Sequence, residues 1–325
     1  MQCSWLGERV ATANVAKVVE NVLRNKEESG WGPNAVFRFP QEGGTGGIWK
    51  KVAALLPPEN QQYNAFVTNI LPAEKKVQLS DGSTISYNKL LSTLPLDLTL
   101  SWLGKADLGK RLTKSASHIV GIGLRGLSPH DNKCWLYYPE DDCPFYRCTV
   151  FSLYAKKNCP AEGAAMPTLR LGDKALPVPA GARPGPYWSL MFEISESDYK
   201  PVNGETVVED TIQGAINTAM MSASDEIVSI YYRRLEHGYP TPSLERDAVL
   251  DEALPWLKKQ DIWSRGRFGS YKYEVANQDH SMMLGVEAVD NILFGTKEFT
   301  LLYPSLTNEG GAKNVDVLYT AGAHL

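Results

Sequence analysis

The sequence predicts a mixed α/β fold in which an antiparallel sheet forms a domain of its own. Two segments, residues 117–155 and 187–195, alternate in polarity and are rich in β-branched and aromatic side chains. Segments with the apolar spacing of helices precede and follow them. The 325 residues suit one large domain or two ordinary ones. A strand-rich middle between mixed flanks favours the second arrangement.

The first 60 residues are expected to contain two helices. The spacing predicts the first over residues 10–23, with Thr12 or Asn14 as its N-cap. Its apolar face carries four valines: Val15, Val18, Val19 and Val22. A glycine-rich loop, GGTGG, then leads into a helix from about Ile48 to Leu56. Such a junction presents backbone N–H groups to an anion, although a tight turn before a surface helix explains it equally well.

The middle of the chain is expected to hold strands, loops and one helix. Asp81 and Gly82 form the turn of a hairpin, which a strand over Leu90–Leu94 follows. Residues 157–186 are rich in Pro, Ala and Gly and predict a long surface loop. The segment EIVSIYYRR predicts a strand, and HGYPTPSLER a proline-stiffened loop. The helix after PVNGET presents five apolar side chains: Val208, Ile212, Ala215, Ile216 and Ala219.

A final helix is predicted where the apolar spacing resumes near residue 280. Gly295 closes this helix, and Asp279 or Ser281 caps its start. The positive end of its dipole then lies against a polar cluster at residues 273–277. Such a terminus stabilises a phosphate or the N1/O2 edge of a reduced flavin, and a capped helix without a ligand is the alternative. The predicted apolar face consists of Met282, Val286, Val289 and Leu293.

Composition and charge narrow the class of protein. The net charge of -4 gives no global basic field for nucleic acid. No apolar run approaches the roughly 18 residues of a membrane helix, and the N-terminus lacks the features of a signal peptide. Five cysteines without CxxC spacing and five scattered histidines predict reduced thiols and no metal site. We therefore expect a cytoplasmic protein that binds neither nucleic acid nor a membrane.

Arginine and tyrosine recur beside glycine, proline or a turn in four short stretches: CSWLGERV, CWLYYPEDDCPFYRCTVFSLY, YYRRLEHGYPTP and SRGRFGSYKYEVANQDHS. Arginine offers a rigid fork of donors that matches phosphate oxygens, and tyrosine adds a donor on a stiff arm. Together they predict a cup for a diphosphate, although each residue taken singly is more often structural. In an unbroken strand Arg147 and Tyr154 point to opposite faces, so they share a cavity only if the strand bends near Ser152.

Several of these stretches resemble a known family. The segments GRFGSYKYEVANQDHSMMLGVEAVDNI, KCWLYYPEDDCPFYR, HGYPTPSLER, WGPNAVFRFP and GGTGGIW are similar to eukaryotic, fungal-type UDP-galactopyranose mutases, from residue 1 to roughly residue 305. The resemblance implies a flavoprotein isomerase that interconverts UDP-galactopyranose and UDP-galactofuranose through an adduct between the sugar and N5 of reduced FAD, with UDP as leaving group. It further implies galactofuranose supply for cell-wall glycans, and a homo-oligomer is an open expectation.

The resemblance also assigns roles to residues. Arg147 and Arg267 are expected to clamp the diphosphate and so to be catalytic. The other expected substrate-binding residues are Asn34 and Tyr137 at the nucleoside, Tyr154, Tyr239 and Tyr273 at the phosphates, and Asn277 at the sugar. The expected cofactor-binding residues are Arg9, Val67, Asn277, Gln278 and Ser281.

One feature of the family is absent from this sequence. The family begins with a strand, a GxGxxG loop and a helix that bind FAD, and this chain has no GxGxxG. The resemblance therefore predicts an N-terminally truncated member with an incomplete FAD-binding nucleotide fold. On this interpretation residues 1–30 are a remnant of a helical domain, residues 31–105 and 261–325 are parts of the FAD-binding domain, and residues 106–260 are the antiparallel sheet, or substrate, domain.

Two other functions stay open at the level of the sequence. A flavin-dependent oxidoreductase of the amine oxidase type shares the fold superfamily, but oxidation of a small amine needs no pair of phosphate-binding arginines. A non-catalytic fragment is the other alternative, and the absent GxGxxG loop is its support.

Overall fold

The computed structural model describes residues 1, 3, 5, 6, 14–26 and 37–309. The chain divides into two compact units. The first unit comprises residues 1–36, 62–114 and 239–325, and the second comprises residues 37–61 and 115–238. Helices and sheets are mixed and antiparallel pairing is present, so the predicted fold class is confirmed.

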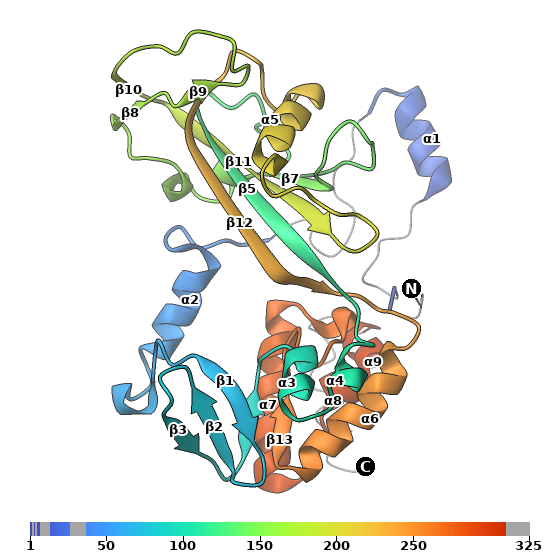
Figure 1. Ribbon diagram of the computed structural model, residues 1–325. Helices are drawn as coiled ribbons and strands as arrows, with labels where there is room; N and C mark the ends of the chain where they lie inside the picture. Colours follow the sequence, from blue (N-terminus) through green and yellow to red (C-terminus); the bar gives the residue numbers. More distant parts are fainter. Residues whose placement is uncertain (2, 4, 7–13, 27–36, 310–325) are drawn as a thin grey trace. The chain divides into compact units, whose positions relative to one another are not determined.

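A six-stranded sheet forms the second unit (Figure 1). The strand order is β6-β7-β11-β5-β12-β9. The pairs β6–β7, β7–β11, β11–β5 and β12–β9 are antiparallel, as the alternating pattern predicts. The bounds are Lys114–Arg125 for β5, Trp135–Tyr137 for β6, Arg147–Val150 for β7, Arg170–Leu171 for β9, Tyr187–Glu196 for β11 and Glu226–Pro240 for β12.

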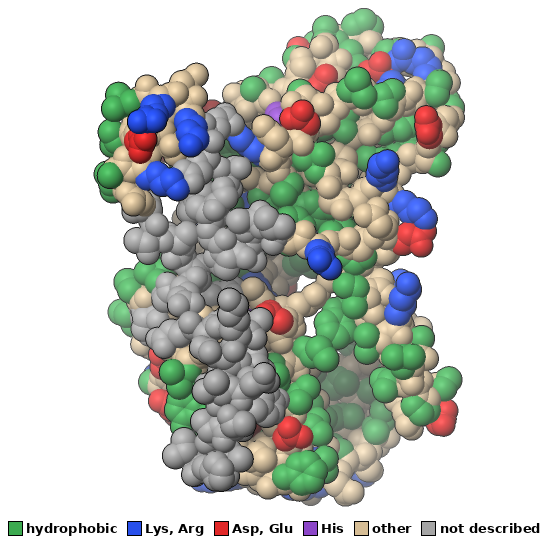
Figure 2. All heavy atoms as spheres, turned by 180° about the vertical axis from the view of Figure 1, so that it is seen from behind, with side chains coloured by type: hydrophobic (Ala, Val, Ile, Leu, Met, Phe, Trp, Pro, Cys, Tyr) green, Lys and Arg blue, Asp and Glu red, His purple; other side chains and the backbone are tan. Residues whose placement is uncertain are grey.

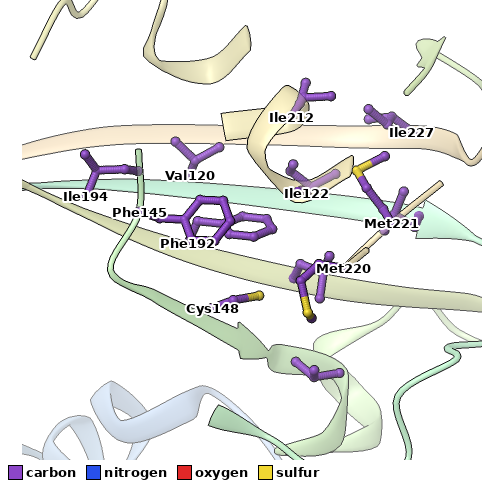
Figure 3. Close-up of a cluster of buried hydrophobic side chains, with 14 of the residues drawn as sticks. Val120, Ile122, Phe145, Cys148, Phe192, Ile194, Ile212, Met220, Met221 and Ile227 are labelled. Atoms are coloured by element: carbon purple, nitrogen blue, oxygen red, sulfur yellow. The ribbon is translucent and has the colours of Figure 1, made fainter. Parts of the chain in front are cut away.

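One face of this sheet carries the core of the second unit. Alternate residues of β5 and β11 are buried there, beneath α5 (Val207–Asn217). In Figure 3 the rings of Phe145 and Phe192 lie side by side, with their centroids 4.6 Å apart. Ile212 of α5 belongs to the same buried cluster, as predicted. Ala219 was expected on this helix but lies beyond its end, with a left-handed φ of 56°.

The predicted surface loop over residues 157–186 contains more structure than expected. It includes β8 (Ala165–Pro167) and β10 (Ala182–Pro184), which pair antiparallel, and it follows the one-turn helix η4 (Lys156–Asn158). The Arg125 guanidinium holds the two strands by donating to backbone oxygens of Met166 at 2.6 Å and Pro184 at 3.1 Å. Hydrogen bonds from a residue so distant in the sequence cannot be predicted from local composition.

Two further boundaries differ from the sequence prediction. Strand β12 continues through Pro240, although HGYP was expected to be loop. A proline at the last position of a strand removes at most one ladder bond, and the Thr241 backbone beyond it still donates to the Thr113 oxygen at 2.8 Å. Strand β4 spans Leu90–Ser92 and stops two residues before the predicted Leu94, since the backbone turns toward α3 (Leu96–Trp102) at Pro95.

Two small sheets and a set of helices build the first unit. Strands β1 (Val67–Leu71), β2 (Lys76–Leu79) and β3 (Thr84–Ser86) form an antiparallel sheet, and β4 pairs parallel with β13 (Ile262–Ser264). The predicted hairpin turn is confirmed: Asp81 accepts from the Ser83 backbone at 2.9 Å, and Gly82 has a φ of 84°. The helices are α3, α4 (Ala106–Gly109), α6 (Arg246–Lys259), α7 (Gln278–Phe294), α8 (Phe299–Leu302) and α9 (Pro304–Glu309).

The two N-terminal helices are present, with one shifted. Helix α1 (Val15–Leu23) is capped by Asn14, whose side chain accepts from the Lys17 backbone at 3.1 Å, while Thr12 lies outside the described residues. Helix α2 (Gly44–Ala53) begins four residues before the predicted Ile48. Its glycines allow a tight start, because a Cβ on Gly47 would lie 2.9 Å from the Glu42 carbonyl oxygen.

Helix α7 buries a different face from the one predicted. Its buried residues are Leu284, Glu287 and Ala288. Met282, Val286, Val289 and Leu293, which were expected to face the core, are exposed. The physical reason is Glu287, which accepts from the Thr300 backbone at 2.9 Å and its hydroxyl at 3.0 Å and so turns a polar position inward.

The surface mixes charged and hydrophobic side chains. Basic and acidic side chains are interspersed on the face drawn in Figure 2, and hydrophobic side chains reach the surface between them. Within the described ranges, no helix has the length and apolar character that would let it cross a bilayer.

Candidate functional site

The predicted site residues fall into two groups, one in each unit. Arg9 and Asn34 lie outside the described residues. The second unit contains Tyr137, Arg147 and Tyr154. The first unit contains Val67, Tyr239, Arg267, Tyr273, Asn277, Gln278 and Ser281.

Arg147 is anchored by a carboxylate in the neighbouring strand. It opens β7 and lies directly opposite Glu193 of β11. Its Nε donates to Oε1 of Glu193 at 2.9 Å, and Nη2 donates to the same oxygen. The Glu193 side chain is only 9% exposed, whereas that of Arg147 is 21% exposed. The guanidinium is thus fixed on its inner side and still reaches solvent.

Two rings and a hydroxyl complete the surroundings of Arg147. The Tyr146 hydroxyl donates to Oε2 of Glu193 at 2.6 Å, so both oxygens of this carboxylate are used. The rings of Trp135 and Tyr146 each lie 5.8 Å from the guanidinium carbon. Tyr137 of β6 is the cross-strand partner of Arg147, and its side chain therefore lies on the same face of the sheet.

Tyr154 reaches the same neighbourhood because the strand does break. Strand β7 ends at Val150, and the one-turn helix η3 (Phe151–Leu153) follows, with Tyr154 at its end. The ring of Tyr154 lies 6.2 Å from that of Trp135, which also contacts Arg147. The bend required near Ser152 is therefore confirmed. Burial raises the pKa of the Tyr154 hydroxyl, which keeps it a neutral hydrogen-bond donor.

An aromatic cluster around Trp135 was not assigned a role from the sequence. Phe37 stacks on Trp135 with ring centroids 4.9 Å apart and planes 9° from parallel. Phe37 and Phe39 each contact Tyr154 with centroids 4.9 Å apart. Phe37 and Phe39 lie inside the stretch FRFP and Trp135 inside CWLYY, so the signal was present in the motifs. Glu193 was also missed, and it has no motif of its own.

Arg267 stands on a turn that depends on glycine. Gly266 has a φ of 87°, and a Cβ on Gly269 would lie 2.1 Å from the Arg265 carbonyl oxygen. The Ser270 backbone closes the turn by donating to the Gly266 oxygen at 2.9 Å. The sequence GRFG therefore places Arg267 shortly after β13, on a tightly defined backbone.

Two tyrosine rings and a carbonyl position the Arg267 guanidinium. Its central carbon lies 4.5 Å from the ring centroid of Tyr239 and 5.7 Å from that of Tyr273. Nη1 donates to the Ala276 carbonyl at 3.1 Å. Among the residues that the structure describes, Arg267 has no carboxylate within ion-pair distance. This arrangement holds a cation without neutralising it.

A buried ion pair supports the segment that carries Tyr273. Tyr273 begins η5 (Tyr273–Val275), and the next residue, Glu274, receives two hydrogen bonds from Arg246 at 2.8 and 2.9 Å. Both partners are buried. A second buried pair joins Arg265 to Glu298. These two arginines are saturated by carboxylates and have structural roles.

The start of α7 follows the polar cluster directly. Asn277 is the N-cap residue and Gln278 the first helical residue, so the predicted caps Asp279 and Ser281 are both wrong. The helix begins earlier because the Ser281 backbone already donates to the Asn277 oxygen at 2.8 Å. Asn277 makes no side-chain cap bond to the helix. The first turn thus presents its positive dipole end beside residues 273–277.

Val67 is the last of the predicted site residues. Val67 is the first residue of β1, where the register with β2 is irregular between Val67 and Asn69. In the described part of the chain, no group of three His, Cys, Asp or Glu side chains is arranged to hold a metal ion.

Comparison with solved structures finds the same fold in known enzymes. A fatty acid isomerase from P. acnes is 12% identical, with a TM-score of 0.51 over 77% of this chain and 52% of its own, which shows the fold alone. A crystal structure of reduced UDP-galactopyranose mutase is 40% identical over 95% of this chain, with a TM-score of 0.82. No protein-family model matches. The chain spans 63% of the length of that mutase.

Proposed function

We propose that the chain acts in UDP-galactopyranose mutase chemistry, as an isomerase of the fungal type that interconverts UDP-galactopyranose and UDP-galactofuranose. The observation that carries the proposal is the 40% identity to a reduced UDP-galactopyranose mutase over 95% of this chain. The amine oxidase alternative has less support, because arginines flanked by tyrosine rings suit a diphosphate better than a small amine.

In the proposed reaction Arg147 and Arg267 bind the diphosphate of UDP. Arg267 supplies a cation that no described carboxylate neutralises. Arg147 supplies donors whose direction is set by Glu193. The hydroxyls of Tyr154, Tyr239 and Tyr273 donate to phosphate oxygens as the leaving group develops charge. Tyr137 and Asn34 are proposed to contact the nucleoside.

The proposed cofactor is FAD in its reduced form. The start of α7 fits the anionic edge of a reduced flavin, because its first turn has a positive dipole end and no side-chain cap from Asn277. Asn277, Gln278 and Ser281 would hold the flavin there, with Arg9 beside it and the backbone at Val67 toward the adenine. Reduced FAD would supply the nucleophile for the sugar carbon that UDP leaves.

The wider setting of the proposal is the one implied by the resemblance. We propose a cytoplasmic protein that acts in galactofuranose supply for cell-wall glycans. Assembly into a homo-oligomer remains a proposal, as does the absence of nucleic acid and membrane partners.

The proposal is tested by calorimetric titration of the purified, folded chain with UDP, UMP and galactose. We expect UDP to bind at least about tenfold more tightly than UMP, because the second phosphate adds charge-assisted hydrogen bonds. Galactose alone should give no heat. Folded protein that binds UDP no better than UMP would overturn the diphosphate assignment. Glu226→Gln, which alters a carboxylate bound to Arg125 and Arg183, is the matched control and should bind UDP like the parent chain.

A further inference from the structure

Glu193 differs from Glu274 and Glu298 in the exposure of the arginine with which it pairs. Glu274 and Glu298 hold arginines whose side chains are only 2% and 6% exposed. Glu193 is equally sheltered at 9%, but the arginine that it holds is 21% exposed. A sheltered carboxylate thus anchors a guanidinium that a ligand can still reach.

The anchoring fixes both the position and the plane of the Arg147 guanidinium. Oε1 of Glu193 accepts from Nε at 2.9 Å and from Nη2 on the same side of the fork. The rings of Trp135 and Tyr146, each 5.8 Å from the central carbon, restrict rotation about that edge. Tyr146 in turn holds Oε2 of Glu193 at 2.6 Å, so the carboxylate cannot turn away without losing this bond.

The same pairing cancels charge. Arg147 and Glu193 together carry no net charge, whereas Arg267 has no carboxylate partner among the described residues. An anion at Arg147 therefore receives mainly directed hydrogen bonds rather than the attraction of a net positive charge.

We propose that Glu193 is a positioning residue for the nucleotide: it directs the Arg147 donors at the diphosphate of UDP and neutralises the charge of that arginine. This inference rests on the proposed function. It gives Glu193 a role that the sequence motifs do not assign.

The test compares Glu193→Gln with Glu193→Ala by calorimetric titration with UDP. Both substitutions remove the negative charge, but only glutamine keeps an acceptor for Arg147 and a group for the Tyr146 hydroxyl. We expect UDP to bind about tenfold more weakly to the alanine variant than to the glutamine variant, the cost of misdirecting one charged donor. Glu193→Gln should bind UDP about threefold more tightly than the parent chain, because a nearby negative charge is gone.

Repeating the pair in an Arg147→Met background shows whether Glu193 acts through Arg147. The difference between alanine and glutamine should then disappear. A difference that persists, or equal UDP affinities of folded Glu193→Gln and Glu193→Ala with Arg147 present, would overturn the inference. Glu226→Ala, which disturbs another arginine-binding carboxylate of the second unit, should leave UDP affinity unchanged.

A second readout separates failure of the inference from failure of the proposed function. If the folded parent chain binds no UDP, the proposed function is wrong. The Nε–H signal of Arg147 in a ¹⁵N-correlated NMR spectrum then tests the positioning alone. We expect a slowly exchanging signal in the parent chain and in Glu193→Gln, and its loss in Glu193→Ala. Identical signals in all three proteins would contradict the positioning role.

Discussion

Arg147 and Arg267 come from similar motifs but are held in opposite ways. Arg147 lies on a sheet strand, opposite the carboxylate of Glu193, with which it forms an ion pair. Arg267 lies on a glycine turn, between the rings of Tyr239 and Tyr273 and a backbone carbonyl. The comparison teaches that a carboxylate of the neighbouring strand fixes the direction of one arginine and neutralises it, whereas the other is held by rings and a carbonyl and has no carboxylate partner among the described residues.

The largest expected effect is on stability, in the second unit. Arg147→Met leaves Glu193 buried without its partner, which should lower the free energy of unfolding by about 3 kcal/mol. Arg267→Met should lower it by less than about 1 kcal/mol, since only ring and carbonyl contacts are lost. Urea denaturation followed by circular dichroism measures both. The double variant Arg147→Met/Glu193→Met is the control and should recover most of the loss. Equal free energies of unfolding for the two single variants would contradict the view that the two arginines differ in their importance for the fold.

For UDP binding, in contrast to stability, we expect the large effect from the substitution of Arg267. Arg267→Met should weaken UDP binding about 100-fold, because a charged donor to the diphosphate disappears. It should also flatten the dependence of UDP affinity on salt, as one cation no longer contributes. Titration at two ionic strengths measures this. Arg111→Met, which removes an exposed ion pair with Glu245, is the control in the first unit. An unchanged salt dependence would show that Arg267 does not supply the attracting charge.

Lowering the pH should weaken ion pairs in which a carboxylate holds an arginine side chain. Burial pushes the pKa of Glu226 upward, but hydrogen bonds from Thr168, Arg125 and Arg183 outweigh it and hold the pKa at about 2, below its usual 4.5. The unfolded chain therefore takes up a proton first as the pH falls, so this stabilisation is complete above about 4.5 and is lost toward 2. Urea midpoints between pH 5 and 2.5 should fall more steeply for the parent chain than for Glu226→Gln. Parallel curves would refute the assignment.

The smallest expected effect concerns a hydroxyl beside Arg267. Tyr273→Phe keeps the ring against the guanidinium and removes one neutral donor to phosphate. UDP affinity should fall about threefold to tenfold, with stability unchanged within about 0.5 kcal/mol. Calorimetric titration measures the affinity. Tyr199→Phe, at an almost fully exposed position, is the control. A 100-fold loss would mean that Tyr273 positions Arg267 through more than its ring.

Local patterns predicted most of the elements that carry the site. Alternation over residues 117–155 predicted the strands around Arg147. The left-handed Gly295 ends α7 where the sequence placed the stop. These features depend on residues close together in the chain, so periodicity and turn chemistry suffice for them.

Contacts between distant residues could not be read in this way. Glu193 lies 46 residues from Arg147, and their pairing depends on the register of two strands. The buried face of α7 is set by Glu287 binding Thr300, which reverses the face that hydrophobicity alone favours. The expectation that Arg147 and Arg267 bind one diphosphate comes from the family resemblance alone, because no local pattern links the two residues.

The most direct test of the central claim is turnover. The purified chain is incubated with FAD, desalted, reduced with dithionite and supplied with UDP-galactopyranose, and the products are separated by chromatography. The account predicts retained flavin absorbance and formation of UDP-galactofuranose, which Arg267→Met should abolish while remaining folded. Folded, flavin-loaded protein that forms no UDP-galactofuranose, or folded protein that retains no flavin, would contradict the claim that this chain is itself a mutase.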